Sequence, residues 1–174
     1  MKTKLKEILG CIANYDDYPQ KGIIFKDVLG ILREPNIFRD LIDKMASSEG
    51  VKDADALISI EARGFLFGSA IAFKSGKPMI VARKPNKLPG ELIMKRYDLE
   101  YGTSTLAIQQ KSIEKYQKFN IIDDVLATGG TAKCISDLLI SNGKLITGYS
   151  MVIELKSLNG RKKLTSPVNS QLLM

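Results

Sequence analysis

Short apolar runs alternate with helical stretches through most of this chain of 174 residues, and this alternation constrains the fold more than any other feature. Four runs have the length and composition of buried strands: 56–60, 78–82, 119–122 and 145–155. Helical stretches of about a dozen residues lie among them, over 64–74 and 131–141. Such alternation is typical of βαβ units. It predicts an α/β fold with a central, mainly parallel sheet flanked by helices.

The N-terminal part of the chain has a different pattern. Apolar residues at helical spacing predict a helix over 3–14, and a second helix that begins at Pro35 and ends near Gly50. Between them, a loop leads into a short extended piece at 23–25. We therefore expect a single domain, with a small N-terminal hood over 1–34 and a core over 35–174.

Three further features qualify the predicted core. Segments 91–97 and 103–109 alternate apolar and polar residues, which predicts an antiparallel excursion from the sheet. Segment 83–90 is too polar and Pro-rich for a strand or helix, which predicts a mobile loop. Asn120 interrupts an otherwise apolar strand, which suggests an edge or partner-facing position.

Composition excludes several classes of protein. The chain is 44% hydrophobic and 26% charged, as globular proteins are, and its longest near-apolar run, 65–73, is too short to span the roughly 30 Å of bilayer hydrocarbon. The charged N-terminus has no apolar stretch typical of a signal peptide, so we expect a cytoplasmic protein without membrane partners. The formal net charge of +7 fits phosphate-rich ligands or nucleic acid.

The chain contains no histidine. A Ser-His-Asp triad, a Cys-His pair and the usual zinc sites are therefore excluded. Any proton transfer must use carboxylates, Lys, Tyr or water.

Segment 119–131 carries the strongest chemical signal: a strand, two acids, then a turn of small residues that opens a helix. Asp123 and Asp124 must reach solvent, a cation or hydroxyl groups, because burying two unpaired carboxylates is costly. The turn over 127–131 lets backbone N–H groups converge on an anion at a helix N-terminus. The segment therefore predicts a phosphate-binding loop. It is neither a P-loop nor a G-x-G-x-x-G dinucleotide motif.

Residues 123–131, Asp-Asp-Val-Leu-Ala-Thr-Gly-Gly-Thr, resemble the 5-phosphoribosyl-1-pyrophosphate (PRPP) motif of the type I phosphoribosyltransferases. Glu-Ala-Arg-Gly-Phe at 61–65 and Leu-Glu-Tyr-Gly at 99–102 narrow the resemblance to the adenine branch. Other matching stretches follow in family order: 17–19, 22–27, 83–85, 87–90, 97–98, 153–155 and 158–161. The resemblance implies the fold of that family and transfer of phosphoribosyl from PRPP to adenine, giving AMP and pyrophosphate in purine salvage.

The resemblance also implies roles for individual residues. Asp123 and Asp124 would hold the ribose hydroxyls, and the loop would hold the 5′-phosphate through Ala127, Thr128, Gly129, Gly130 and Thr131. Pyrophosphate would meet a further set: Glu61, Ala62, Arg63, Arg83, Lys84, Lys87 and Tyr101. Lys84 and Lys87 fit solvated loop charges nearly as well. Mg²⁺ would be held mainly through PRPP oxygens and water, without direct protein ligands.

Adenine needs stacking surface and hydrogen bonds at its edge. The resemblance assigns this task to Ile24, Phe25 and Lys26 of the hood, with Val125 over the opposite face, although Phe25 would also suit a plain core. Because histidine is absent, Glu100 is the candidate catalytic residue that manages the proton at N7.

Other functions stay open at this point. A guanine- or xanthine-preferring enzyme would share segment 119–131 and differ in the hood. A PRPP-sensing regulator that binds nucleic acid would need an added domain or clustered Arg, whereas the basic residues here are scattered, so no nucleic-acid partner is expected. A nucleotide-binding module without catalysis would leave Arg63 and Glu100 unexplained. A homodimer is expected from the resemblance alone.

Overall fold

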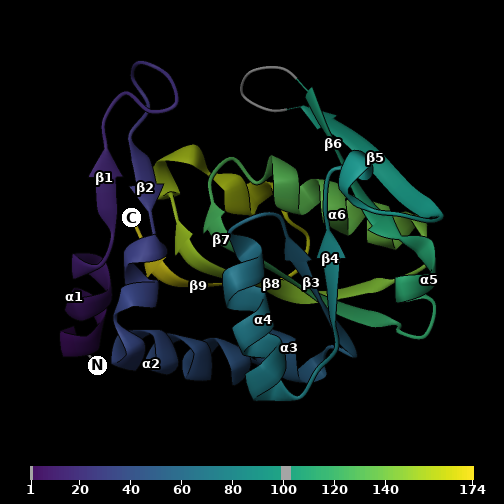
Figure 1. The fold of residues 1–174 in the computed structure, drawn as a ribbon, viewed down its shortest axis with the longest axis horizontal. Helices are drawn as coiled ribbons and strands as arrows, with labels where there is room; N and C mark the ends of the chain where they lie inside the picture. Colours follow the sequence, from purple (N-terminus) through teal and green to yellow (C-terminus); the bar gives the residue numbers. More distant parts are fainter. Residues whose placement is uncertain (1, 99–102) are drawn as a thin grey trace. The chain divides into compact units, whose positions relative to one another are not determined.

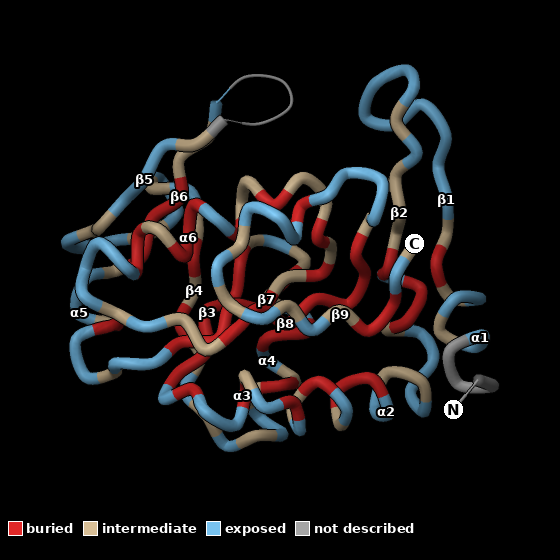
Figure 2. Tube along the Cα trace, turned by 180° about the vertical axis from the view of Figure 1, so that it is seen from behind, coloured by how far each residue is buried: buried red, intermediate tan, exposed pale blue. Residues whose placement is uncertain are grey.

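Five parallel strands form the central sheet of the computed structural model, which describes residues 2–98 and 103–174 (Figure 1). The strands are β3 (Ala56–Ile60), β4 (Met79–Ala82), β7 (Lys118–Leu126), β8 (Leu145–Glu154) and β9 (Val168–Leu173), in the order β4-β3-β7-β8-β9. The predicted parallel sheet is confirmed. Every residue of β3 is buried, since helices cover both faces of a parallel sheet (Figure 2).

The chain divides into two compact units, residues 1–44 and 45–174. The first holds α1 (Lys2–Gly10), β1 (Ala13–Tyr15), β2 (Phe25–Asp27), the 3₁₀ turn η1 (Leu29–Arg33) and most of α2 (Pro35–Ala46). Strands β1 and β2 pair antiparallel, with Tyr15 opposite Phe25. The predicted first helix ends early because residues 13–15 pair with β2 instead of continuing the helix.

The second predicted helix is also shorter than expected. Helix α2 ends at Ala46, and a separate short helix, α3 (Glu49–Asp53), follows in the second unit. Ser48 separates them because its backbone is extended, with φ −66° and ψ 149°. Helix α3 packs against β8, and a Cβ on Gly50 would lie 2.7 Å from the Asn120 side-chain nitrogen.

Helices of the second unit lie on opposite faces of the sheet. Helix α4 (Gly64–Ser75) packs against β3 and β7, and Gly68 sits directly on Ser59 of β3. Helix α6 (Gly130–Ser141) packs against β7, β8 and β5, and it shares an apolar core with Phe119, Ile121 and Tyr149. Alternate residues along the strands thus face different helices.

The antiparallel excursion is confirmed. Strands β5 (Leu92–Asp98) and β6 (Thr103–Gln109) form an arm that packs on α6, and α5 (Gln110–Ile113) leads from β6 toward β7. A backbone bridge between Arg83 and Ala107 joins the arm to the end of β4. The segment between β4 and β5 contains a 3₁₀ turn, η2 (Pro85–Lys87).

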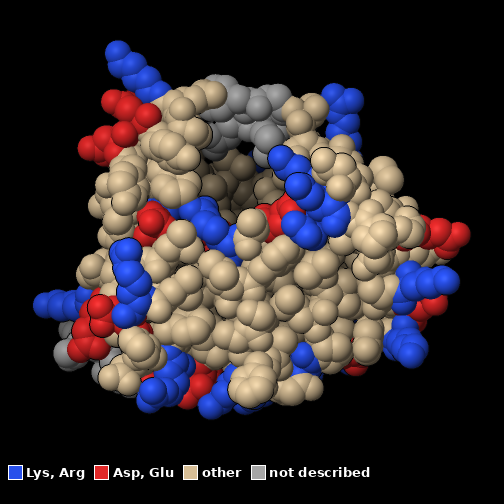
Figure 3. Space-filling view, viewed as in Figure 1, with Lys and Arg blue, Asp and Glu red and all other residues tan. Residues whose placement is uncertain are grey.

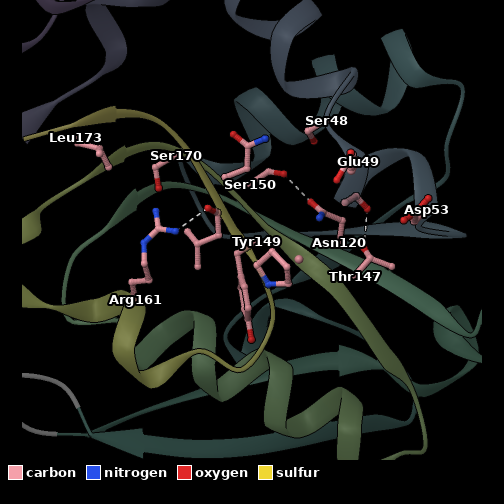
Figure 4. A pocket seen from close by; sticks show the side chains of 15 residues that line it. Ser48, Glu49, Asp53, Asn120, Thr147, Tyr149, Ser150, Arg161, Ser170 and Leu173 are labelled. Atoms are coloured by element: carbon pink, nitrogen blue, oxygen red, sulfur yellow. Dashed lines mark hydrogen bonds between the residues drawn. The ribbon is translucent and has the colours of Figure 1, made fainter.

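The predicted edge position of Asn120 is wrong. Asn120 lies in β7, the middle strand of the sheet, and only 1% of its surface is exposed. Its side-chain oxygen accepts a hydrogen bond of 2.8 Å from Ser150 Oγ of β8, which satisfies a polar group in the interior (Figure 4).

Candidate active site

The predicted phosphate loop joins the end of β7 to the start of α6. Gly129 has φ +78°, a left-handed conformation that favours glycine, and no side chain in the described part of the chain caps the helix there. A hollow of about 60 Å³ is lined by Asp123 and residues 125–132. The loop therefore presents uncapped backbone N–H groups to a hollow, which suits an anion.

The acid pair lies in β7 itself, because the strand extends to Leu126 instead of ending at the predicted Ile122. Asp123 is half-buried, whereas Asp124 is buried, with 5% of its surface exposed. The Asp124 backbone N–H donates to Asp123 Oδ1 at 2.9 Å. Burial raises the pKa of both carboxyls, and the neighbouring Asp124 raises that of Asp123 further.

Arg63 connects this acid pair with the turn that follows β3. Its Nε lies 2.7 Å from Asp124 Oδ2, and its charge opposes the burial-driven rise of the Asp124 pKa. Gly64 permits the approach, because a Cβ there would lie 2.9 Å from Asp123 Oδ1. Two segments predicted to bind different parts of PRPP are thus adjacent.

The Glu61 side chain binds the beginning of segment 83–90, which carries Arg83, Lys84 and Lys87. Its Oε2 accepts from Arg83 Nε at 3.0 Å, and its Oε1 accepts from the Lys84 backbone N–H at 2.6 Å. The Arg83 guanidinium also lies over the Phe65 ring, 5.5 Å from its centroid. The Glu61 carboxylate therefore orients Arg83 and the Lys84 backbone beside the Arg63 turn.

Three other residues predicted to bind pyrophosphate are exposed, and two further predicted residues lie outside the described chain. Lys84 and Lys87 have exposed side chains, and Ala62 is also exposed. Glu100 and Tyr101 lie outside the described residues, so their roles stay predictions.

The predicted adenine residues fall in both units. In the first unit, Phe25 meets the Tyr18 ring edge-on with centroids 5.2 Å apart, and Lys26 Nζ donates to Asn14 Oδ1 at 2.8 Å. Ile24 is 53% exposed. In the second unit, Val125 is half-buried in β7. Their joint contact with adenine stays a prediction.

The segment that follows β8 also contacts the site, and its residue pattern alone predicts no role for it. This segment contains two 3₁₀ turns, η3 (Lys156–Leu158) and η4 (Gly160–Lys163), and Gly160 packs directly on the phosphate loop. The signal was present in the matching stretches 153–155 and 158–161.

A separate polar cavity of about 510 Å³ lies on the α3 side of the sheet, lined by Asn120, Ser150 and Ser170 among others (Figure 4). It shares no lining residue with the hollow at the phosphate loop. The larger cavity is thus distinct from the phosphate loop, and Asn120 and Arg161 are among the residues that line it.

Comparison with known proteins decides the family. An adenine phosphoribosyltransferase of Prochlorococcus marinus (strain MIT 9515) is 57% identical over 172 residues, which is 99% of each chain. The chain belongs to the adenine phosphoribosyltransferase family. A further member, from Thermotoga neapolitana, is 44% identical over 88% of this chain and 90% of its own. No family model matches the chain.

Solved adenine phosphoribosyltransferases share the fold. The enzyme from Thermoanaerobacter pseudethanolicus superposes with a TM-score of 0.90 at 37% identity, covering 98% of this chain and 99% of that one. The Saccharomyces cerevisiae enzyme, in complex with D-2,5-dideoxy-2,5-imino-altritol 1,6-bisphosphate and adenine, gives 0.89 at 35% identity with the same coverage. The predicted type I phosphoribosyltransferase fold is confirmed.

Proposed function

We propose that the protein transfers the 5-phosphoribosyl group of PRPP to N9 of adenine, forming AMP and pyrophosphate. Full-length membership of the adenine phosphoribosyltransferase family carries the proposal. The site supports it, because a phosphate loop, two carboxylates and a basic turn meet at the carboxyl ends of β3 and β7, where open α/β sheets bind ligands.

Each part of the site has a task in this reaction. Backbone N–H groups of the phosphate loop hold the 5′-phosphate, and Asp123 and Asp124 accept hydrogen bonds from the ribose hydroxyls. Arg63 and Arg83 pair with pyrophosphate and stabilise its negative charge as the bond to the ribosyl carbon breaks. Glu61 acts on Arg83, since both its oxygens already accept hydrogen bonds.

Glu100 and the residues that bind adenine complete the site. Glu100 exchanges the proton at N7 of adenine. Phe25 and Val125 cover the two faces of the purine, and Ile24 and Lys26 offer backbone groups to its edge. Tyr101 adds a contact to pyrophosphate.

We also propose Mg²⁺ as the metal of the reaction. Mg²⁺ prefers oxygen donors and keeps several waters, so oxygens of PRPP and water would be its main ligands. Within residues 6–97 and 103–174, no group of three or more Cys, Asp or Glu side chains is placed to hold a metal ion. The ion neutralises charge on the leaving pyrophosphate when bound.

The surface of α4 supports a homodimer. This helix is apolar around most of its circumference, and its exposed side carries Phe73, 92% exposed, and Leu66, 42% exposed. Figure 3 shows an area without charged side chains at the centre of the face on which α4 lies. An apolar helix face on a water-soluble protein is typical of a protein–protein interface.

We place the protein in the cytoplasm. None of the helices within residues 2–98 and 103–174 has the length and apolar character needed to span a bilayer. Scattered basic residues give no reason to add nucleic acid to the partners proposed here, which are PRPP, adenine, AMP and pyrophosphate.

A direct assay tests the function. The purified protein is mixed with PRPP, Mg²⁺ and equal concentrations of adenine and guanine, and nucleotide and pyrophosphate are separated by chromatography. We expect AMP and pyrophosphate in equal amounts with little GMP. A preference for GMP would indicate the guanine-preferring alternative, and the absence of both nucleotides would refute the proposed phosphoribosyltransferase activity.

A further inference from the structure

The segment after β8 touches the phosphate loop through its backbone at Gly160. A Cβ on Gly129 would lie 2.5 Å from the Gly160 carbonyl oxygen, and a Cβ on Gly160 would lie 2.8 Å from the Gly129 nitrogen. Real Cβ atoms do not approach other heavy atoms so closely, so the two backbones are in direct contact with no side chain between them. The position of residue 160 therefore limits where the loop can lie.

Arg161 fixes residue 160 from the adjacent position. Its Nε donates to Glu154 Oε1 at 2.9 Å, and its Nη2 donates to Glu154 Oε2 at 2.5 Å, which makes a two-pronged contact with the end of β8. Its Nη1 donates to the Val168 carbonyl oxygen of β9 at 2.8 Å. Figure 4 shows Arg161 reaching from its 3₁₀ turn toward Ser170. One guanidinium thus ties η4 to two neighbouring strands.

The acceptor of this contact is well defined. Glu154 is 5% exposed, and Ser170 Oγ donates a further hydrogen bond of 2.7 Å to its Oε2. Arg161 and the other donors hold the pKa of Glu154 below its ordinary value, so this carboxylate stays ionised and a strong acceptor. By contrast, the Arg161 side chain is 46% exposed. Its burial adds little to the core, and its distinctive contribution is geometric.

We propose that Arg161 is a positioning residue for the 5′-phosphate of PRPP, because its fork on Glu154 holds Gly160 against the loop 127–129. The inference rests on the proposed function and assigns a role to the stretch 158–161. The proposal distinguishes binding of the 5′-phosphate of PRPP from binding of its pyrophosphate. The 5′-phosphate depends on Arg161, whereas pyrophosphate depends on Arg63 and Arg83 and is independent of it.

Ligand binding to four proteins tests the proposal: wild type, Arg161→Ala, Arg161→Lys and the control Lys162→Ala. Lys162 is an exposed cation in the same 3₁₀ turn, and it carries the same charge. Calorimetry measures the Kd of ribose 5-phosphate, which reports the loop, and of pyrophosphate with Mg²⁺, which reports the basic turn. Steady-state rates give kcat and the KM values of PRPP and adenine.

We expect Arg161→Ala to raise the Kd of ribose 5-phosphate and the KM of PRPP by about tenfold each, as the loss of a charge-assisted contact implies. The Kd of pyrophosphate and the KM of adenine should change by less than about twofold. Arg161→Lys keeps one ion pair without the fork. Its Kd for ribose 5-phosphate and its KM for PRPP should lie between those of wild type and Arg161→Ala. Lys162→Ala should match wild type in both.

Other results would overturn the proposal. Equal weakening of ribose 5-phosphate and pyrophosphate would indicate general loosening of the fold, and unchanged ribose 5-phosphate binding would show that the loop does not depend on Arg161. If Arg161→Ala fails to fold, the comparison of Arg161→Lys with Lys162→Ala decides. Failure of the proposed function is distinguishable, since wild type would then form no AMP while ribose 5-phosphate binding still reports the loop.

Discussion

Replacing Asp123 by Asn should make the folded protein more stable and the enzyme much less active. Burial and the neighbouring Asp124 raise the pKa of Asp123, so the ionised form is unfavourable in the folded state. Asparagine has the same shape, and its Oδ1 can still accept the hydrogen bond from the Asp124 N–H. The substitution removes an unfavourable charge without removing the contact.

The size of the effect follows from linkage between proton binding and folding. Each unit of pKa shift is worth about 1.4 kcal/mol. Because the folded carboxyl binds its proton more tightly than the unfolded one, wild-type stability falls as pH rises from the ordinary carboxyl pKa through the raised one. At pH 8 we expect Asp123→Asn to raise the free energy of unfolding by about 1.4 kcal/mol for each unit by which folding raises the wild-type pKa, with a corresponding rise in Tm.

Thermal unfolding at pH 5 and pH 8 measures this gain, and initial rates with PRPP measure the loss of activity. The Tm advantage should be larger at pH 8, while kcat/KM for PRPP falls at least about tenfold because a charged acceptor of the ribose hydroxyls is lost. A lower Tm than wild type at pH 8, or a Tm difference independent of pH, would refute this reasoning.

Asp55 offers a control of opposite sign in the same chain. Backbone N–H groups of Gln117 and Lys118 donate to its Oδ2 at 2.9 and 2.8 Å, and these bonds lower its pKa. Its ionised form therefore favours folding above the ordinary carboxyl pKa, and this contribution is lost as pH falls through the lowered value. Asp55→Asn should lower Tm at pH 8, with a gap that closes on acidification.

Three further predictions concern other parts of the molecule. Glu100→Gln should lower kcat far more than PRPP affinity, and an unchanged kcat would remove Glu100 from the mechanism. Gly68→Ala should destabilise the fold by about 1–3 kcal/mol in urea unfolding, because the new Cβ would lie 2.7 Å from Ser59 Cβ; an unchanged midpoint would contradict this packing. Phe73→Glu should convert a dimer to a monomer in light scattering, and a persistent dimer would exclude α4 from the interface.

Local patterns predict the strands that are buried on both faces, and they fail for β9. Strand β3 is wholly buried, so its sequence is a continuous apolar run with one serine. Strand β9 reads Val-Asn-Ser-Gln-Leu-Leu and contains no such run. It becomes a strand because it pairs with β8, with Tyr149 opposite Val168, and this partner is not visible in the local sequence.

Local sequence likewise predicts one part of the site and fails for the rest. The phosphate loop is contiguous, so its residue types and spacing are sufficient to predict it. The pairs Glu61–Arg83 and Arg63–Asp124 join segments that are distant in sequence, and their geometry depends on which strands become neighbours. The sequence patterns therefore predict that these four side chains bind the ligand, and only the structure shows that they also bind one another.

The strand order determines when the site can form during synthesis. Strands β5 and β6 are sequence neighbours and can pair early, whereas β3 must wait for β7, with Ala56 opposite Phe119. Gly160 and β9 follow later still. Contacts between distant segments form slowly, since loop closure must precede them. A growing chain thus contains the phosphate loop before it contains Gly160, and the contact between them can form only once the segment after β8 has been made.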